Sequence, residues 1–314
     1  MTLCINCGDE LINNITKVQD YITLETFQIL SCPQCQLLST PPQTTASKYY
    51  PPQYYGNLGR RFPAIIEKLI ERSRFHRAQI IRNLIHTPGR IIDVGCGRAI
   101  MLGQLQKFGW DVTGIEINDA LIPSLSSGGI NTVKSASLNP LLTPSNLNGF
   151  DLITCFHSLE HMKNPNQFIN DAYSILKPGG YLIIEVPNLS SFQFMLTKLK
   201  WFHLDVPRHL YHFKLPVLSK MIIENGFIIK KVSTLSFEYG VFGFAQSIIN
   251  LVSPTLNFAY RHLLKLQKNK NGDQIIDYLL LPIIFPLLII GCIVELFAPL
   301  FQKGSVIRII AQKK

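Results

Sequence analysis

Four cysteines near the start of the chain have the spacing of a metal site. They form two Cys-x-x-Cys pairs, Cys4 with Cys7 and Cys32 with Cys35, about 24 residues apart. Each pair places two thiolates on one tight turn, and two such turns complete the tetrahedron that zinc prefers. Because four thiolates leave no open coordination position, we expect a structural zinc and not a catalytic one. Redox-active or incidental cysteine pairs are the alternative interpretation.

A turn with two glycines, Gly95 and Gly97, follows an apolar run. Residues 91–94 predict a buried parallel strand, and residues 98–108 predict the helix after the turn. Such a turn lets the backbone approach a ligand closely. A second predicted strand, residues 110–116, ends in a carboxylate about 20 residues further on, where an acid accepts hydrogen bonds from both hydroxyls of a ribose. The pattern predicts a nucleoside-binding site.

The residues around this turn argue against a dinucleotide. A dinucleotide fingerprint needs a third glycine where this chain has Ile100. Asp93, just before the turn, would repel a diphosphate, whereas a cationic sulfonium and an ammonium group would be stabilised beside it. We therefore expect Glu116 to hold the ribose of a nucleoside with a cationic substituent.

At this point the sequence resembles the class I S-adenosylmethionine-dependent methyltransferases. The matching segments are residues 92–97, Glu116, 150–161 and 176–188, in the order and at the spacing of that family. The resemblance covers roughly residues 88–235 and the C-terminal strand. It implies S-adenosylmethionine as the cofactor and an α/β fold, a Rossmann-like, doubly wound sheet of seven strands.

The same resemblance assigns the cofactor to residues that follow four of the strands. Asp93 and the backbone of Gly95, Cys96 and Gly97 would face the methionine portion, Glu116 with Ile117 next to it would hold the ribose, Ser135 and Ala136 would lie near the adenine, and Phe156 with His157 would border the methyl group. The chain departs from the family at two places. Ala99 replaces a common third glycine, and Ser135-Ala136 replaces an acid that often contacts the adenine amine.

Three histidines are candidates for a catalytic base: His157, His161 and His209. Methyl transfer is an in-line displacement at a carbon that its sulfonium already activates, so the protein mainly aligns the reactants. A base is needed only when the acceptor is a hydroxyl or a carbon acid. His157 is the best candidate because it is nearest the expected methyl position; stacking or capping is its alternative role, and packing is that of His161. In the loop that holds His209, a structural pair of Asp205 with Arg208 competes evenly with substrate contact.

About 70 residues separate the expected sixth strand, residues 226–234, from the expected seventh, residues 305–311. In the resembled family these two strands are normally joined by a short turn, so this connection is an insert. It contains two apolar stretches, residues 239–260 and 278–301. The second is long enough to span a membrane.

Three observations argue against a simple crossing. Both flanking strands must return to one sheet, Pro282 and Pro286 disrupt a helix, and Glu295 interrupts the apolar run. We expect a monotopic or re-entrant helical pair in the cytoplasmic leaflet. The alternatives are a two-span hairpin, which would carry the basic residues between the two stretches across the membrane, and a helical cap on the enzyme or in a dimer.

The composition is apolar and basic, with 47% hydrophobic residues, 16% charged residues and a net charge of +10. These values favour contact with an anionic lipid surface or a nucleic acid. A basic helix, residues 60–83, suits anionic headgroups. We expect no signal peptide, and the cysteine usage fits a reducing cytoplasm.

The predicted organisation is a zinc ribbon at residues 1–40, a Pro/Tyr-rich linker at 41–59, a methyltransferase core at 60–235, a hydrophobic helical insert at 236–304 and a last core strand at 305–314. The N-terminal half resembles zinc-ribbon methyltransferases found with polysaccharide and envelope-glycan synthesis. We predict an S-adenosylmethionine-dependent enzyme that methylates a small-molecule, glycan or lipid-linked acceptor, located in the cytoplasm and peripheral on the inner face of the membrane.

Two other functions remain open at this level. An RNA methyltransferase with a ribbon for recognition fits the basic charge, but nucleic acid is the less favoured partner because basic and aromatic residues do not interleave. A non-catalytic scaffold that binds the cofactor is the other alternative.

Overall fold

The computed structural model describes residues 2–43, 46–51, 62–266 and 275–314. Most of the predicted linker, the start of the basic helix with Arg60 and Arg61, and residues 267–274 of the insert lie outside these ranges. The chain divides into two compact units. The sheet unit contains Ile65–Val186, Leu218–Val232 and Arg308–Lys314, and the ribbon unit contains Met1–Ala64, Pro187–Val217 and Ser233–Ile307. Since these units follow packing and not chain order, the segment boundaries given above stay a prediction.

The sheet unit is built on a seven-stranded sheet with the strand order β10-β11-β8-β7-β4-β5-β6. Parallel pairing joins β4 to β5 and to β7, β5 to β6, and β7 to β8. The strands are β4 (Arg90–Val94), β5 (Asp111–Glu116), β6 (Asn131–Lys134), β7 (Phe150–Phe156), β8 (Leu176–Pro187), β10 (Phe227–Ser233) and β11 (Val306–Lys313). The predicted Rossmann-like sheet is confirmed, and its strand order reverses direction at β4.

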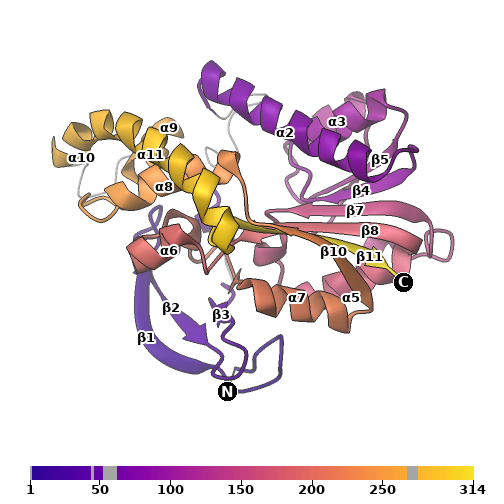
Figure 1. Cartoon of the computed structure of the whole chain (residues 1–314), viewed down its shortest axis with the longest axis horizontal. Helices are drawn as coiled ribbons and strands as arrows, with labels where there is room; N and C mark the ends of the chain where they lie inside the picture. Colours follow the sequence, from indigo (N-terminus) through magenta and orange to yellow (C-terminus); the bar gives the residue numbers. More distant parts are fainter. Residues whose placement is uncertain (1, 44–45, 52–61, 267–274) are drawn as a thin grey trace. The chain divides into compact units, whose positions relative to one another are not determined.

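Helices cover both faces of this sheet. Figure 1 shows α2 (Ala64–Leu84) and α3 (Ile100–Lys107) on one face, and α5 (Pro165–Ile175) and α7 (Leu215–Glu224) on the other. A short helix, α4 (Ile122–Ser127), precedes β6. Because the central strands are covered on both sides, consecutive residues in them are buried, as Ile91 and Ile92 of β4 are.

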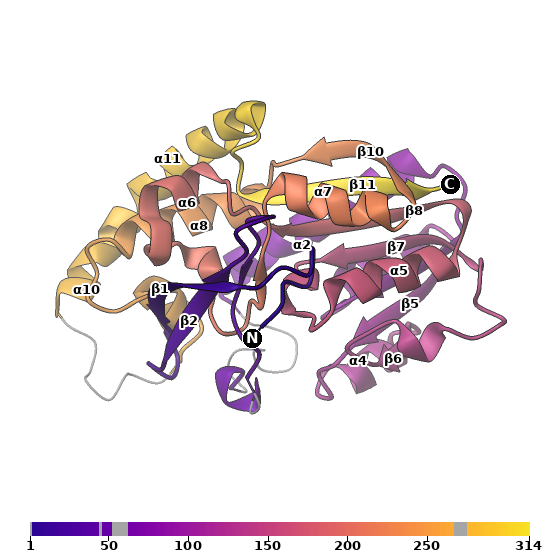
Figure 2. The ribbon, with the colours of Figure 1, turned by 90° about the horizontal axis from the view of Figure 1, so that it is seen from below.

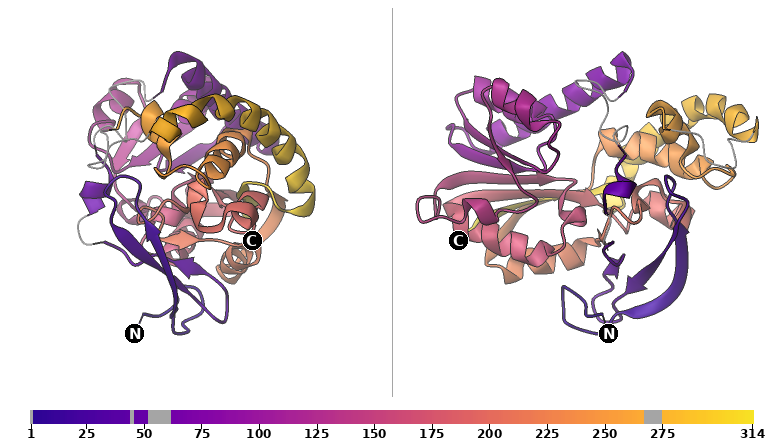
Figure 3. Two further views of the ribbon diagram at one scale, coloured as in Figure 1. Left: turned by 90° about the vertical axis from the view of Figure 1, so that its left-hand side faces the viewer. Right: turned by 180° about the vertical axis from the view of Figure 1, so that it is seen from behind.

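The ribbon unit contains a four-stranded sheet with the order β1-β2-β3-β9. Its strands are β1 (Ile12–Gln19), β2 (Thr26–Ser31), β3 (Leu38–Ser39) and β9 (Tyr211–His212), and Figure 3 shows β1 and β2 as a curved hairpin. Residues 21–30 are rich in β-branched and aromatic side chains, which predict a strand over the whole segment, but the strand begins only at Thr26. Residues 21–23 form a turn, because Asp20 accepts hydrogen bonds from the backbone and hydroxyl of Thr23, both at 2.8 Å.

The insert folds into more pieces than the two apolar stretches suggested. It contains α8 (Phe237–Ile249), α9 (Phe258–Leu263), α10 (Ile275–Leu280) and α11 (Ile284–Phe297), with 3₁₀ turns at Leu281–Ile283 and Ala298–Phe301. The first stretch breaks after α8, and the second breaks at the turn that contains Pro282, as expected of proline. By length and composition alone, the helical stretch Ile275–Phe301 could cross a membrane.

The loop after β8 packs on the insert inside the ribbon unit. It contains α6 (Phe192–Thr197) and 3₁₀ turns at Lys198–Lys200 and Phe202–Leu204. Helix α8 contacts both α6 and α11 (Figure 2). Gln193 of α6 donates a hydrogen bond to the Gly240 carbonyl of α8 at 2.7 Å, so α6, α8 and α11 form one packed group.

Candidate functional site

The glycine turn lies between β4 and α3, where the strand order of the sheet reverses. Ligands of such sheets bind beyond the carboxyl ends of the strands at this reversal. Gly95 and Gly97 have φ angles of +73° and +54°, which glycine adopts without strain. A Cβ on Gly95 would overlap the Ser158 hydroxyl, so glycine lets the loop after β7 close on the turn. A Cβ on Gly97 would meet nothing within 4 Å, and this side of the turn is open to a ligand.

Asp93 is a buried carboxylate next to the turn. Its side chain accepts a hydrogen bond from the Thr154 hydroxyl at 2.7 Å. Burial raises the pKa of Asp93 to about 6, against the opposing effects of Thr154 and of nearby arginines. An anion that is costly to bury is stabilised by a cation placed beside it. The ammonium and sulfonium of S-adenosylmethionine carry that charge.

Glu116 ends β5 and is held in one orientation by backbone groups. One carboxylate oxygen accepts from the Gly97 N–H at 2.9 Å, and the other accepts from the N–H groups of Ile117 and Asn118 at 2.8 Å each. These bonds fix an anion beside the open side of the turn, as a ribose-binding carboxylate requires. Ile117, next in the chain, has an exposed side chain that offers an apolar surface.

Asn118 was not predicted from the sequence. Its Nδ2 is buried, and among the described residues it has no hydrogen-bond partner. A buried donor without a partner is costly unless a ligand accepts from it. Its position in the loop after the acidic residue is a signal that sequence reasoning could have used.

The remaining predicted cofactor residues lie around the same strand ends. The Ser135 N–H, just after β6, donates to the Glu116 carbonyl at 3.2 Å, and Ala136 next to it is exposed. Cys96 lies within the glycine turn. Burial, together with the charges of Asp93 and Glu116, raises the pKa of its thiol above the ordinary value, so the thiol stays protonated at neutral pH.

His157 follows β7 and Phe156 and is almost fully buried, with a left-handed φ of +52°. Its Nε2 lies 3.0 Å from a carboxylate oxygen of Glu185, and its Nδ1 lies 3.7 Å from Glu160. Because an ionised carboxylate only accepts, Nε2 carries the proton and donates to Glu185. Nδ1 is then the ring nitrogen that can accept a proton.

Glu185 is buried in β8 between two arginines. Arg77 of α2 lies 2.8 Å from the oxygen that faces His157, and Arg308 of β11 pairs with the other oxygen. Burial alone would raise the pKa of Glu185, but Arg77, Arg308 and His157 hold it well below its usual range. The carboxylate therefore stays ionised. A charged residue inside an apolar strand was the only sequence signal for this network.

Arg77 corrects one expectation about the basic helix. The sequence placed it on a face suited to lipid headgroups, but its side chain is buried. Its guanidinium also lies 4.3 Å from the centre of the Phe156 ring. Since the ion pair with Glu185 holds it in the core, Arg77 is not available to a membrane.

The surroundings of the other two candidate histidines, His161 and His209, differ from those of His157. His161 ends a 3₁₀ turn in the sheet unit and is half-buried. His209 belongs to the ribbon unit, where its Nδ1 donates to the His203 carbonyl at 2.8 Å. The pair that the sequence suggested between Asp205 and Arg208 is present at 2.7 Å.

The four predicted metal-binding cysteines come together in the ribbon unit. Their sulfur atoms all lie within 4.8 Å of one another, with Cys4 and Cys35 at 3.5 Å and Cys7 and Cys32 at 3.2 Å. Zinc–sulfur bonds of about 2.3 Å place tetrahedral thiolates at a similar separation of about 3.8 Å. Burial raises the pKa of Cys4 to about 12, whereas hydrogen bonds from Cys35 and Cys7 outweigh burial and lower that of Cys32 to about 7. This donor set fits zinc.

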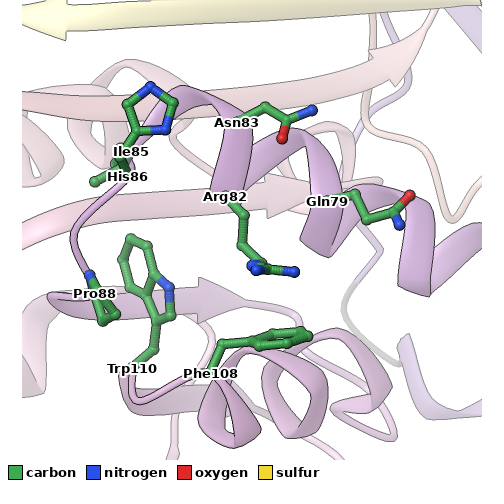
Figure 4. A pocket seen from close by; sticks show the side chains of 8 residues that line it. All are labelled: Gln79, Arg82, Asn83, Ile85, His86, Pro88, Phe108 and Trp110. Carbon is green, nitrogen blue, oxygen red and sulfur yellow. The ribbon is translucent and has the colours of Figure 1, made fainter.

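A pocket elsewhere in the sheet unit lies at the amino ends of β4 and β5, the ends opposite the candidate cofactor site. Pro88 and Trp110, which precede β4 and β5, line it together with residues at the end of α2. Figure 4 shows the Arg82 side chain directed toward Phe108, whose ring centre is 3.7 Å from the guanidinium. Because the glycine turn lies at the carboxyl ends of the strands, this pocket is separate from the candidate cofactor site.

The fold is that of a Rossmann-like protein with a candidate nucleoside site, and comparison identifies its family. A family model described as a methyltransferase domain matches residues 68–231, which is half of the chain. The chain belongs to this methyltransferase-domain family, and the predicted family is confirmed.

Individual relatives share part of this core. A ubiquinone biosynthesis O-methyltransferase of Colwellia psychrerythraea is 35% identical over 116 residues, 35% of this chain and 46% of that protein. The enzyme of the same description from Bordetella avium is 31% identical over 137 residues, 40% of this chain and 56% of that protein. The chain thus spans about half the length of these curated relatives. A solved SAM-dependent methyltransferase from Archaeoglobus fulgidus aligns over 79% of this chain and 99% of that one, with 22% identity and a TM-score of 0.47.

Proposed function

We propose that this protein transfers a methyl group from S-adenosylmethionine to a small-molecule, glycan or lipid-linked acceptor at the cytoplasmic surface of the membrane. One observation carries the proposal. Two buried carboxylates, Asp93 and Glu116, flank a glycine turn that is open on the Gly97 side. Such a site suits a ligand with a cationic part and a sugar diol, and it disfavours a diphosphate.

The cofactor supplies a methyl group that its sulfonium has already activated. The protein's own task is to bind and orient. Asp93 offers its charge to the cationic methionine portion, and Glu116 offers oxygen atoms to the ribose hydroxyls. Asn118 Nδ2 donates to a nucleoside acceptor atom, and Ser135-Ala136 borders the adenine. Alignment of this kind can supply about 7–11 kcal/mol of a displacement barrier.

His157 is the residue that we propose as the base when the acceptor is a hydroxyl. Glu185 holds the ring by its Nε2, which leaves Nδ1 to take the acceptor proton as the new bond forms. The buried ion pairs of Glu185 keep this orientation fixed. Phe156, just before it, borders the methyl position.

Similarity supports a small-molecule acceptor. The curated relatives named above are described as ubiquinone biosynthesis O-methyltransferases, which act on a small molecule and transfer to oxygen. We propose the same broad class for this chain, without its particular acceptor.

We also propose that the four cysteines hold one structural zinc. Cys4, Cys7, Cys32 and Cys35 satisfy its coordination fully, so the metal takes no part in the transfer. Its contribution is to the folding of the ribbon, which is too small to bury a core of its own.

The proposed membrane contact rests on the outward side of α10, α11 and the 3₁₀ turn that follows α11. Phe285, Leu300 and Phe301 are 71–75% exposed, and the neighbouring outward residues are also apolar. An apolar surface of this extent marks an interaction site.

The acidic residues of this segment point inward. Glu295 is buried and accepts hydrogen bonds from Ser236 N–H at 2.8 Å and from the Ser305 hydroxyl at 2.7 Å. Asp277 is buried as well and accepts from the Thr255 hydroxyl at 2.7 Å. Buried carboxylates near both ends of the segment thus favour helices that lie against the protein over helices that cross the bilayer. This arrangement supports a monotopic contact.

Positive charge accompanies further apolar residues on α6 and the turn after it. Lys198 and Lys200 are exposed beside Met195, Leu196 and Leu199, which are also exposed. Cations among apolar side chains suit the anionic surface of a cytoplasmic leaflet.

The test is a screen of cell-extract metabolites and lipids with a labelled methyl donor. We expect wild-type protein to label an acceptor, mainly in the lipid fraction, and Glu116→Ala to lose the labelling together with S-adenosylmethionine binding in calorimetry. Asp119→Ala, which removes an exposed carboxylate of the same loop, is the matched control. Folded, metal-replete protein that gives no heat with S-adenosylmethionine or its demethylated product would refute the proposal.

A further inference from the structure

The ribbon and the loop after β8 share one sheet. The second cysteine pair is followed by β3, and β3 pairs with β9 at the end of that loop, with Leu38 opposite His212 and Ser39 opposite Tyr211. The Thr40 N–H continues the pairing by donating to the Leu210 carbonyl at 2.9 Å. A strand of the ribbon thus sets the backbone path of residues 210–212.

A buried arginine joins the same two segments. Arg208 is fully buried, and its guanidinium lies 2.6 Å from Asp20, in the turn between β1 and β2. It also pairs with Asp205, donates to the Tyr49 carbonyl at 3.1 Å, and lies 4.4 Å from the centre of the Tyr21 ring. A buried cation needs all of its partners, so the loop and the ribbon turn hold each other in place.

The two segments also share an apolar core. Trp201 and Leu204 of the loop pack in one buried cluster with Phe27 and Ile29 of β2 and with Val18 of β1. The ribbon strands therefore bury their side chains against the loop. If the turns that contain the cysteines unfold, the ends of β2 and β3 are no longer fixed. The loop then loses the strands against which it packs.

We propose that the zinc ribbon positions the loop of residues 201–213 for the acceptor, and that metal occupancy sets whether this loop is ordered. The inference rests on the proposed function in one respect, namely that this loop, which follows the carboxyl end of β8, binds the acceptor, as loops after this end of the strands do in such folds. Arg208 and Asp20 are positioning residues, since they act through the loop. The carboxylates that we assign to the cofactor belong to the sheet unit, so we expect cofactor binding not to depend on the metal.

The chain carries its own reporter for this test. It has two tryptophans, Trp201 in the shared core and Trp110 in the sheet unit. In a Trp110→Phe background, acrylamide quenching of fluorescence reports on Trp201 alone. We expect removal of zinc with a chelator to raise the quenching constant at least threefold, and return of zinc to restore it. S-adenosylmethionine affinity in calorimetry should change less than twofold.

A variant tests the buried link independently of the metal. Arg208→Met should expose Trp201 to acrylamide even with zinc bound, whereas Arg82→Met, an exposed arginine of the sheet unit, should not. The chelator experiment needs no change at Arg208, so it decides the question even if this variant does not fold.

Two results would overturn the inference. One is unchanged Trp201 quenching after metal analysis shows that zinc was bound and has been removed. The other is a loss of S-adenosylmethionine affinity on zinc removal, because the metal would then support the cofactor site as well. Absence of S-adenosylmethionine binding in both zinc-loaded and zinc-free protein would instead refute the proposed function, while the quenching result would still stand.

Discussion

At the scale of single residues, the environment of a side chain decides what its chemistry can be. His157 could be named from the sequence because it follows an expected strand end. The carboxylate that orients it could not, because Glu185 lies 28 positions further along the chain and Arg77 lies on a distant helix. Such networks cannot be predicted from the sequence, because their residues are far apart along the chain. They come together only when β7, β8 and α2 have folded.

For His157 we expect His157→Asn to lower the rate of methyl transfer by about 10² or more, since general-base catalysis contributes on that order. S-adenosylmethionine affinity should change little, because the cofactor contacts assigned above do not include the ring nitrogens. Single-turnover labelling measures the rate, with His76→Asn on the exposed face of α2 as the control. An unchanged rate would assign His157 to packing alone.

Asp93 gives a prediction about pH. Its pKa is raised to about 6 by burial, so the stability that the protonated form contributes is present below about pH 4 and is lost as pH rises through 6. Without cofactor, ionised Asp93 should cost at most about 3 kcal/mol at pH 7.5. Urea unfolding should therefore show Asp93→Asn to be more stable than wild type at pH 7.5 but not at pH 4, while its cofactor binding is lost. Equal stability differences at both pH values would contradict the burial argument.

At the scale of elements, the apolar runs predicted the strands of the sheet unit well. Strands β4, β5, β10 and β11 start and end within three residues of the expected positions. The insert was predicted less well, because a long apolar stretch does not show where it turns. Glu295 seemed an obstacle inside a membrane-like segment, and in the structure it is the residue that binds α11 to Ser236 and Ser305.

Close packing of α8 against Glu295 makes Gly240 sensitive to substitution. An added Cβ would overlap the Glu295 carboxylate. We expect Gly240→Ala to lower the free energy of unfolding by about 1–3 kcal/mol, as overpacking does. Gly103→Ala in α3, where a Cβ meets nothing within 4 Å, should be neutral or stabilising. Chemical denaturation of both variants measures the difference, and equal stabilities would show that α8 shifts freely.

At the scale of the whole molecule, the family could be predicted from the sequence because each of its motifs lies within one short segment of the chain. The grouping of the ribbon, the loop after β8 and the insert into one compact unit could not be predicted, since it depends on contacts between segments far apart in the chain, such as Tyr49 with Arg208, which are 159 positions apart.

The proposed membrane contact belongs to the ribbon unit as a whole. We expect the protein to sediment with vesicles that contain anionic lipid. Ile293→Glu with Phe297→Glu, on the exposed side of α11, should weaken this binding at least tenfold, because each apolar side chain contributes about 1.5–3 kcal/mol when buried. Ile223→Glu, an exposed position of α7, is the matched control. Cofactor binding should be the same in all variants. Equal sedimentation of the α11 variant and wild type would refute the contact.

The place of β11 in the sheet has a consequence for biosynthesis. Residues 306–313 lie between β10 and β8, although both of those strands leave the ribosome much earlier. A nascent chain must therefore keep a strand-wide gap open, with exposed apolar edges, while more than 70 further residues are translated. During that interval the growing polypeptide is vulnerable to aggregation through the uncovered edges of β8 and β10.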